Sequence, residues 1–155
     1  DYAMAGRTYR YLTGDPLYPF GFGLSYTTFE YSEISLQTEK VTPGQPLPAS
    51  VTVRNTGDYD AEEVVQVYLT DLEASVTVPL CKLVHFERVH LSPGEEQVVE
   101  MTITPEMMSL VDEDGQPRLE PGRFRLTVGG AAPCARSEQL GAATPATAQF
   151  EVVDK

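Results

Sequence analysis

The sequence of 155 residues has few basic residues, few cysteines and no tryptophan. Its 11 Lys and Arg stand against 23 Asp and Glu, which gives a formal net charge of −12. This excess of negative charge argues against nucleic acid or an anionic membrane as a partner. No apolar run approaches the roughly 20 residues that span a bilayer, and no signal peptide opens the chain. Because the first residue is Asp1 rather than methionine, we expect a processed chain or a piece of a longer one.

The two cysteines, Cys81 and Cys134, leave two alternatives open. If they were paired, the disulfide would close a loop of about fifty residues and add roughly 4 kcal/mol of stability in the chain-entropy model. If they are free thiols, they behave as small hydrophobic residues. Two cysteines are too few to identify the redox compartment.

Metal ligands are present, but their spacing is wrong for a metal site. His85 and His90 are five positions apart, which places them on opposite faces of a regular strand. The run Asp112–Gly115 resembles the start of a calcium loop but lacks the third alternating ligand and the distant glutamate. We therefore expect an exposed turn there, and neither a metal nor another cofactor.

Catalytic patterns are also lacking. Hydrolysis of a glycoside needs two carboxyl groups that face each other across a cleft, whereas the adjacent Glu62 and Glu63 diverge on a strand. Ser25 follows Gly-Leu and does not lie in a Gly-x-Ser-x-Gly elbow. There is no glycine-rich phosphate loop and no basic patch, so the sequence predicts no catalytic residue in this chain.

A period of two dominates the chain after about Thr27. Apolar residues alternate with polar ones around Val51, Val65, Val99, Phe124 and Phe150, as expected of half-buried strands. Pro-Gly turns precede three of these runs. The alternation is irregular in 82–91, which suggests a β-bulge. Only 104–108 has the pattern of a helix, with a proline at its first position. About seven short strands separated by turns predict an all-β, immunoglobulin-like β-sandwich over 27–155. The Ala- and Gly-rich segment 131–146 is expected to be a long loop.

Residues 1–26, which we call the strap, differ from this pattern. They hold seven of the fourteen aromatic residues and show no regular period. If solvated, such a surface would be adhesive, so we expect it to be buried against the sandwich or against a preceding domain. The expected packing residues at this seam are Tyr18, Phe20, Phe22, Tyr26 and Phe29. An alternative is that Tyr9, Tyr11 and Tyr18 stack on sugar rings, with Arg7, Arg10 and Asp15 bonding to the hydroxyls.

A series of motifs carries a family resemblance. Residues 6–11 (GRTYRY) and 16–29 (PLYPFGFGLSYTTF) resemble the segment that joins the last two domains of family 3 glycoside hydrolases. Residues 53–57, 62–68, 83–89, 91–95 and 120–124 resemble strands and turns of their C-terminal fibronectin type III-like domain. The Arg-Thr-Tyr-Arg-Tyr form is most similar to the β-xylosidase and α-arabinofuranosidase branch.

The resemblance implies a division of the chain and an accessory role. Residues 1–26 would be the linker and the end of a preceding α/β domain, and 27–155 the fibronectin type III-like sandwich. The catalytic residues of the family lie in domains that this chain does not contain. The expected partners are therefore the catalytic domains of the same polypeptide, secreted or lysosomal as one larger enzyme.

Two functions of different classes follow from these observations. The first is an accessory domain that stabilises or orients the catalytic core of an exo-acting glycosidase. The second is a free-standing module that binds polysaccharide or protein. A third, that the chain is itself a hydrolase, is disfavoured by the missing carboxyl pair.

Overall fold

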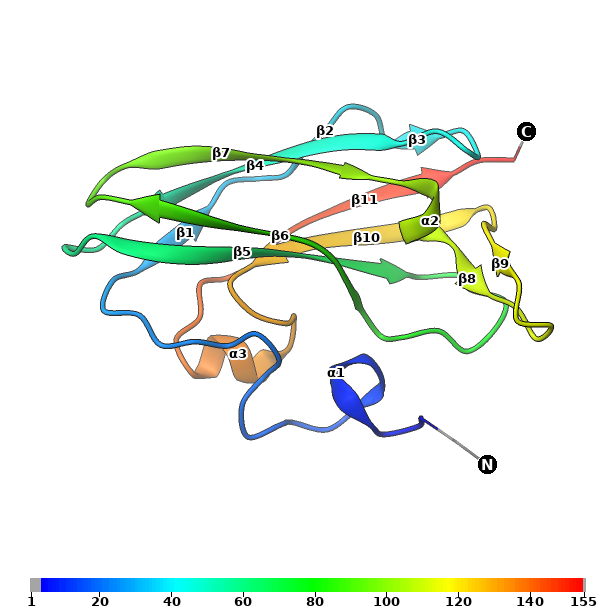
Figure 1. Ribbon diagram of the computed structural model, residues 1–155, viewed down its shortest axis with the longest axis horizontal. Coiled ribbons are helices and arrows are strands. Elements are labelled where there is room, and N and C mark those ends of the chain that lie inside the picture. Colours follow the sequence, from blue (N-terminus) through cyan, green and yellow to red (C-terminus); the bar gives the residue numbers. More distant parts are fainter. Residues whose placement is uncertain (1–3, 155) are drawn as a thin grey trace.

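The computed structural model of the chain describes residues 4–154 and has two β-sheets packed face to face (Figure 1). In the first sheet, β4 (Leu47–Asn55) pairs along one side with β7 (Glu96–Ile103). On its other side β4 pairs with β1 (Phe29–Tyr31) and β2 (Ser35–Leu36). The second sheet has the order β3-β11-β10-β5-β6, and a small third ladder joins β8 (Leu110–Val111) to β9 (Pro117–Arg118). This all-β architecture confirms the predicted sandwich.

The second sheet has five strands in the described residues. They are β3 (Lys40–Val41), β5 (Ala61–Asp71), β6 (Lys82–Leu91), β10 (Gly122–Gly129) and β11 (Ala146–Val152). All their pairings are antiparallel except that of β3 with β11, which is parallel. Between Val67 and Tyr68 the register of β5 against β6 shifts, so that Val84 is left without a partner. This irregularity confirms the bulge predicted in 82–91.

The core lies between the sheets and is made of the residues that the alternation placed on one face. Val53, Val67, Val99 and Leu126 are fully buried there. Their neighbours in sequence point to the outside, as the pleat of a strand requires. The core also contains Phe124 and Phe150, whose rings stack at a centroid distance of 5.5 Å across β10 and β11. The period of two therefore predicted the inward face correctly.

In residues 4–154, three short helices lie outside this pattern: α1 (Thr8–Tyr11), α2 (Pro105–Met108) and α3 (Ala135–Gln139). The sequence predicted α2 correctly. It predicted no regular structure where α1 and α3 lie, and in this respect it was wrong. Residues 131–146 do not form an open loop, because Ser137 of α3 is buried and donates its hydroxyl hydrogen to Ala132 O at 2.7 Å.

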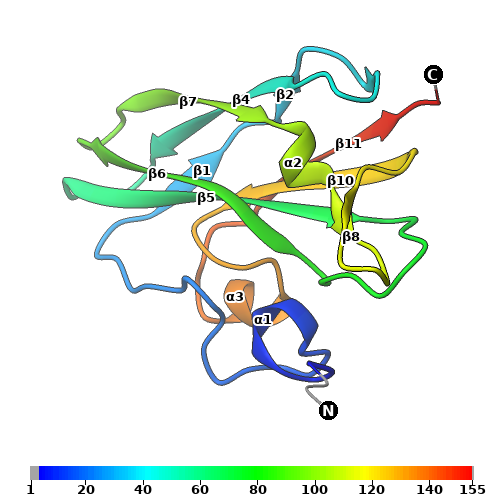
Figure 2. The same cartoon turned by 45° about the vertical axis from the view of Figure 1, so that its right-hand side comes forward.

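The described part of the strap, residues 4–26, crosses the outer face of the second sheet. Figures 1 and 2 both show α1 and α3 on this side, beneath β5 and β10. Residues 1–3, including Tyr2, lie outside the described residues. The strap and the 131–146 segment therefore form a partial third layer on the sandwich.

Candidate functional site

The outer face of β5 is buried, although alternate residues of a sandwich strand usually face water on that side. Gln66 is 4% exposed and Tyr68 is fully buried. Tyr68 forms a small second core with Cys81 and Ala132, and Tyr9 of the strap packs against it. The cover over this face is therefore part of the folded structure, and it is the most unusual feature of the molecule.

Gln66 is the polar centre of this cover. Its Oε1 accepts the hydroxyl hydrogen of Tyr68 at 2.6 Å. Its Nε2 donates to Gly21 O at 3.0 Å and to Gly130 O at 2.8 Å. A second main-chain contact lies close by, where Ala132 N donates to Phe20 O at 2.9 Å. These bonds fasten the strap to both β5 and the 131–146 segment.

Gly21 makes this contact possible. Its φ is +73°, a conformation that residues with a side chain rarely adopt. A Cβ at this position would collide with the side-chain amide of Gln66. The glycine therefore serves both the turn of the strap and its close approach to the sheet.

An aromatic stack secures the strap at a second place. The rings of Tyr9 and Phe20 lie 4.2 Å apart and nearly parallel, and the edge of Tyr68 meets Tyr9 at 6.2 Å. Leu83 N donates to the Tyr9 hydroxyl at 3.4 Å, and Leu80 N donates to Arg10 O at 2.7 Å. Burial raises the pKa of the Tyr68 phenol above its usual value, which keeps its proton available for Gln66.

The chain directly after the strap is held by Asn55, the fully buried last residue of β4. Its Oδ1 accepts from Thr27 Oγ1 at 2.6 Å and from Gly57 N at 3.1 Å. Its Nδ2 donates to Tyr59 O at 2.8 Å and to Leu91 O at 2.9 Å. Every donor and two acceptor positions of this amide are used, which explains an asparagine at the start of the Asn-Thr-Gly turn.

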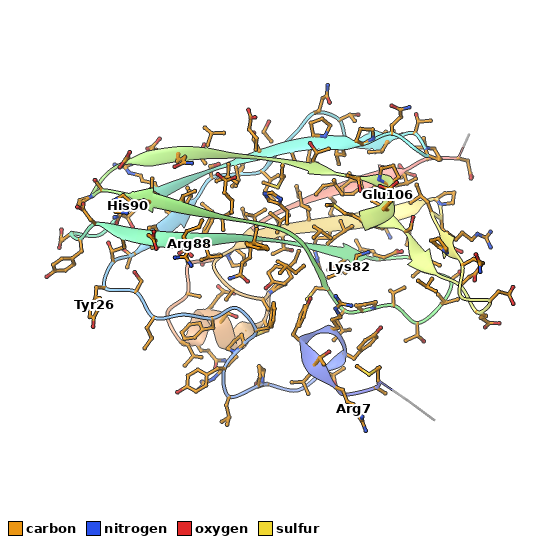
Figure 3. All side chains as sticks on the ribbon, viewed as in Figure 1. Arg7, Tyr26, Lys82, Arg88, His90 and Glu106 are labelled. Atoms are coloured by element: carbon orange, nitrogen blue, oxygen red, sulfur yellow. The ribbon has the colours of Figure 1, made fainter. Side chains whose placement is uncertain are left out.

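Between these anchors, four large apolar side chains of the strap face the solvent. We call this set the apolar ridge: Leu17, Tyr18, Leu24 and Tyr26 are 84%, 73%, 91% and 96% exposed. Figure 3 shows Tyr26 projecting from the strap away from the sheets. All four belong to residues 17–26 of the strap, and apolar surface exposed in this way is typical of interaction sites in soluble proteins.

The other residues predicted for the seam have different surroundings. Phe20 is stacked on Tyr9, and Phe22 is half-buried with its ring 6.3 Å from that of Tyr18. Phe29 belongs to the core between the sheets, so its ring is not available at a seam. The strap is thus folded back onto the sandwich at Phe20, whereas Tyr18 and Tyr26 remain outside.

Of the three tyrosines predicted to bind sugar, two are engaged in the fold. Tyr9 is committed to its stack, and half-buried Tyr11 lies in a hollow beside Lys82 and Met107. Only Tyr18 presents most of its ring to solvent. Binding of sugar by these residues stays a prediction.

Both cysteines are free thiols in the structure, and they line the same groove. Cys81 is buried, and burial raises the pKa of its thiol to about 11. Cys134 Sγ lies 3.4 Å from Ser137 Oγ. The free thiols correspond to one of the two alternatives that the sequence left open, and the disulfide is the other.

One carboxyl group has unusual surroundings that the sequence did not indicate. Glu63 lies largely buried near Gly130, and burial raises the pKa of its side chain to about 6, although Val64 N donates to Oε1 at 2.7 Å. Its neighbour Glu62 instead accepts from Arg88 at 2.8 Å on the surface. The two carboxyls thus lie in different environments and do not form a pair across a cleft.

Within residues 4–154, no three His, Cys, Asp or Glu side chains are placed to share a metal ion. In the same range, none of the helices is long and apolar enough to cross a membrane.

Comparison with known proteins connects this fold to enzymes that act on sugars. Residues 63–132 match the model of the fibronectin type III-like domain. A β-xylosidase of Formosa agariphila is 38% identical over 85% of this chain and 18% of its own length. A periplasmic β-glucosidase of Salmonella typhimurium is 40% identical over 74% of this chain and 15% of its own.

Solved structures give the same result. A β-glucosidase from Erythrobacter marinus superposes with a TM-score of 0.79 and 35% identity, covering 93% of this chain. A β-glucosidase from Listeria innocua in complex with glucose gives a TM-score of 0.77 and 36% identity over 89% of the chain. In both structures the match covers 18% of the other chain. The chain thus spans less than a fifth of each of these relatives.

Proposed function

The chain is a fibronectin type III-like domain of the kind carried by β-xylosidases and β-glucosidases of glycoside hydrolase family 3, and we propose that it stabilises the catalytic domains of such an enzyme. The whole polypeptide would be an exo-acting glycosidase, with xylose- or glucose-containing substrates. The chain itself would supply no catalytic group. Its contribution is a surface on which the catalytic domains dock.

The apolar ridge carries this proposal. Leu24 and Tyr26 are more than nine-tenths exposed, yet hydrogen bonds hold the main chain on both sides of them, at Gly21 and at Thr27. A rigid main chain that presents apolar side chains to water is arranged for a partner, because it loses little conformational freedom when the partner binds. Burial of a Leu side chain contributes about 1.5–3 kcal/mol.

The decisive experiment uses the full-length polypeptide. We expect deletion of 27–155 to lower its melting temperature and secreted yield. We also expect the double substitution Leu24→Ser, Tyr26→Ser to lower the melting temperature by several degrees, while kcat of the surviving enzyme changes little.

A matched control removes two apolar side chains that are exposed elsewhere, Val98→Ser and Val111→Ser. The control pair should leave the melting temperature within about 1 °C, because surface substitutions away from special features are nearly neutral. In the isolated 155-residue chain the ridge pair should be equally neutral. If the truncated polypeptide kept its melting temperature and yield, the stabilising role would be refuted.

The same proposal extends to location. A domain of a secreted or periplasmic glycosidase would follow its parent enzyme there, as the periplasmic relative from Salmonella typhimurium suggests. Fractionation of cells that express the full-length polypeptide tests this directly. Recovery only in the cytoplasmic fraction would contradict it.

A free-standing binding module is the competing function, and exposed Tyr18 is the observation that favours it. Aromatic rings can stack on sugar rings. Titration of the isolated chain with xylo-oligosaccharides, followed by NMR, distinguishes the two functions. Shifts at Tyr18 at millimolar sugar would support binding, and their absence would remove its only support.

A further inference from the structure

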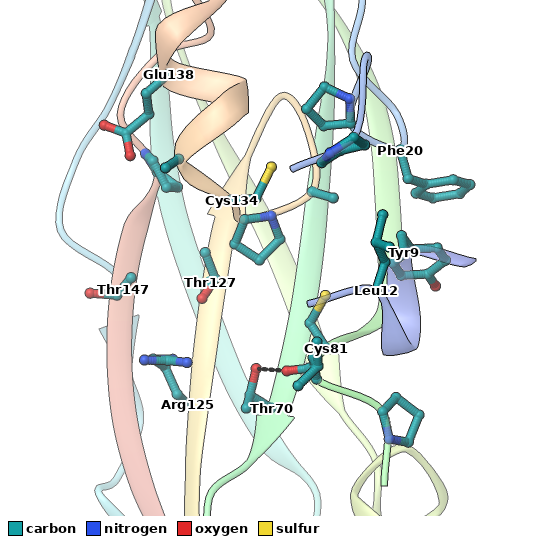
Figure 4. Close-up of a pocket in the computed structure, with 18 of the residues that line it drawn as sticks. Tyr9, Leu12, Phe20, Thr70, Cys81, Arg125, Thr127, Cys134, Glu138 and Thr147 are labelled. Carbon is teal, nitrogen blue, oxygen red and sulfur yellow. Dashed lines mark hydrogen bonds between the residues drawn. The ribbon is translucent and has the colours of Figure 1, made fainter. Parts of the chain in front are cut away.

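A groove of about 670 Å³ lies on the outer face of the second sheet, between the strap and the segment that contains α3 (Figure 4). Tyr9, Leu12 and Phe20 border it on the strap side, and Cys134 and Glu138 border it on the other. Grooves of this volume with apolar walls and a few polar groups are the usual form of a binding site.

The floor of the groove is built from the outward residues of three strands, β5, β10 and β11. Thr127 of β10 is paired directly with Thr147 of β11. Arg125 of β10 lies two residues along the same face and is paired with Thr70 of β5. Because alternate residues of a strand share a face, these hydroxyls and the guanidinium point into the groove together.

The charged side chains that line the groove in residues 4–154 are Asp71, Glu138 and Arg125, and only Arg125 has neither a hydrogen bond nor an ion pair. Asp71 Oδ1 accepts from Glu73 N at 3.0 Å, and Glu138 Oε2 accepts from Thr144 Oγ1 at 3.3 Å. The Arg125 guanidinium makes no hydrogen bond and has no carboxylate within 4.0 Å in residues 4–154. Arg125 is the only cation among the described side chains that line the groove, and its exposed guanidinium is free to pair with a carboxylate.

We propose that this groove receives an acidic side chain of the preceding catalytic domain, whose carboxylate pairs with Arg125. The inference rests on the proposed function, because that function supplies the docked domain. The strap forms one wall of the groove and also carries the apolar ridge, so a domain docked on the ridge lies next to the groove. Apolar contacts on the ridge would provide affinity, and the charge pair would set the orientation.

Cys134 is a natural reporter of occupancy. It lines the groove and is only half-buried, whereas Cys81 is buried and its raised pKa keeps it slow to react near neutral pH. We expect N-ethylmaleimide to label Cys134 at least tenfold more slowly in the full-length polypeptide than in the isolated chain. The experiment is done on the Cys81→Ala variant, so that mass spectrometry detects labelling of Cys134 alone. Labelling of the same variant unfolded in guanidinium gives the rate for a fully accessible Cys134.

Substitution of Arg125 tests the charge pair itself. In the full-length polypeptide, Arg125→Glu should restore most of the labelling rate of Cys134, and Arg125→Lys should restore less. The matched control is Arg54→Gln on the other sheet, whose partner is exposed Glu96 at 3.6 Å; it should leave the rate unchanged. Equal rates for the wild type and for Arg125→Glu would overturn the pairing.

The outcomes separate this inference from the proposed function. If Cys134 were labelled equally fast in both polypeptides while the truncation still lowered stability, the groove inference would fail and the stabilising role would stand. If Cys134 were protected but the truncation were harmless, the groove would be filled without a stabilising role. Slower labelling of the isolated chain in millimolar glucuronate, but not in glucose, would assign the groove to a free acidic sugar and overturn the proposal.

Discussion

Tyr68 donates its phenolic hydrogen to Gln66 Oε1 across 2.6 Å, and this bond turns the Gln66 amide nitrogen toward the strap. Through that nitrogen Gln66 binds the carbonyls of Gly21 and Gly130. One buried side chain of β5 thus joins two segments that lie far from it in sequence. This network fastens the strap to the sandwich.

The first prediction concerns Gln66. Gln66→Ala should lower the free energy of unfolding by about 3 kcal/mol or more, since it leaves the Tyr68 hydroxyl and two carbonyls without their partner and each unsatisfied buried group costs about 1–3 kcal/mol. Urea unfolding of the isolated chain measures this change. Gln149→Ala, on an exposed position of β11, is the control and should change stability by no more than about 0.5 kcal/mol.

The second prediction compares two glycines of the strap. Gly21→Ala should cost about 1–3 kcal/mol, because its φ is positive and a Cβ would displace Gln66. Gly23→Ala is the control, because no atom lies within 4 Å of a Cβ built there. If thermal unfolding gave the same midpoint for both variants, the close approach of Gly21 to Gln66 would be contradicted.

The third prediction concerns Asn55. Asn55→Asp should destabilise the chain by about 3 kcal/mol or more, because it replaces two donated hydrogen bonds by repulsion between a carboxylate and the carbonyls of Tyr59 and Leu91. Denaturant unfolding at neutral pH measures the loss. Thr28→Val removes only an exposed hydrogen bond to Thr56 and should cost about 0.5 kcal/mol or less. A comparable loss in both variants would show that Asn55 is not the anchor.

The fourth prediction is a pH dependence that originates at Glu63. Its folded-state pKa of about 6 is above the ordinary 4.5, so the folded chain holds the proton more tightly than the unfolded chain does. The stability gained from the neutral carboxyl is therefore complete below pH 4.5 and is lost as the pH rises through 6. At neutral pH the loss amounts to about 2 kcal/mol.

Glu63→Gln should abolish this dependence. When the pH is raised from 4 to 7.5, the wild type should lose about 2 kcal/mol of unfolding free energy relative to the variant. Urea unfolding at several pH values measures it, and Glu62→Gln controls for removal of a negative charge. A difference that stayed constant with pH would exclude Glu63 as the source.

The sequence predicted the sandwich well because its core obeys a local rule. Val51, Val67 and Leu126 each lie in a run of alternating residues, and the pleat of a strand converts that alternation into an inward face. The bulge in β6 was visible for the same reason, as an interruption of the alternation. The proline at its first position predicted the short helix α2.

The cover on the second sheet had no such signal. The alternation placed Gln66 and Tyr68 correctly on the outward face, but their burial depends on a strap that lies more than forty residues away in sequence. The strap has no period, so no local rule indicates where it packs. Asn55 could have been suspected from its place between a strand and a glycine turn, whereas the surroundings of Glu63 and Arg125 arise only when distant segments meet.

The bulge at Val84 has a consequence for the solubility of the chain. In the described residues, the only strand that pairs with β6 is β5, so β6 is an edge strand of the sheet, which the strap covers at Leu83. A long regular edge is a template on which another strand can pair and start aggregation. The extra residue breaks the spacing of the outward hydrogen-bonding groups, and Arg88 adds a charge nearby. The same irregularity that interrupts the alternation thus protects the sheet from edge-to-edge association.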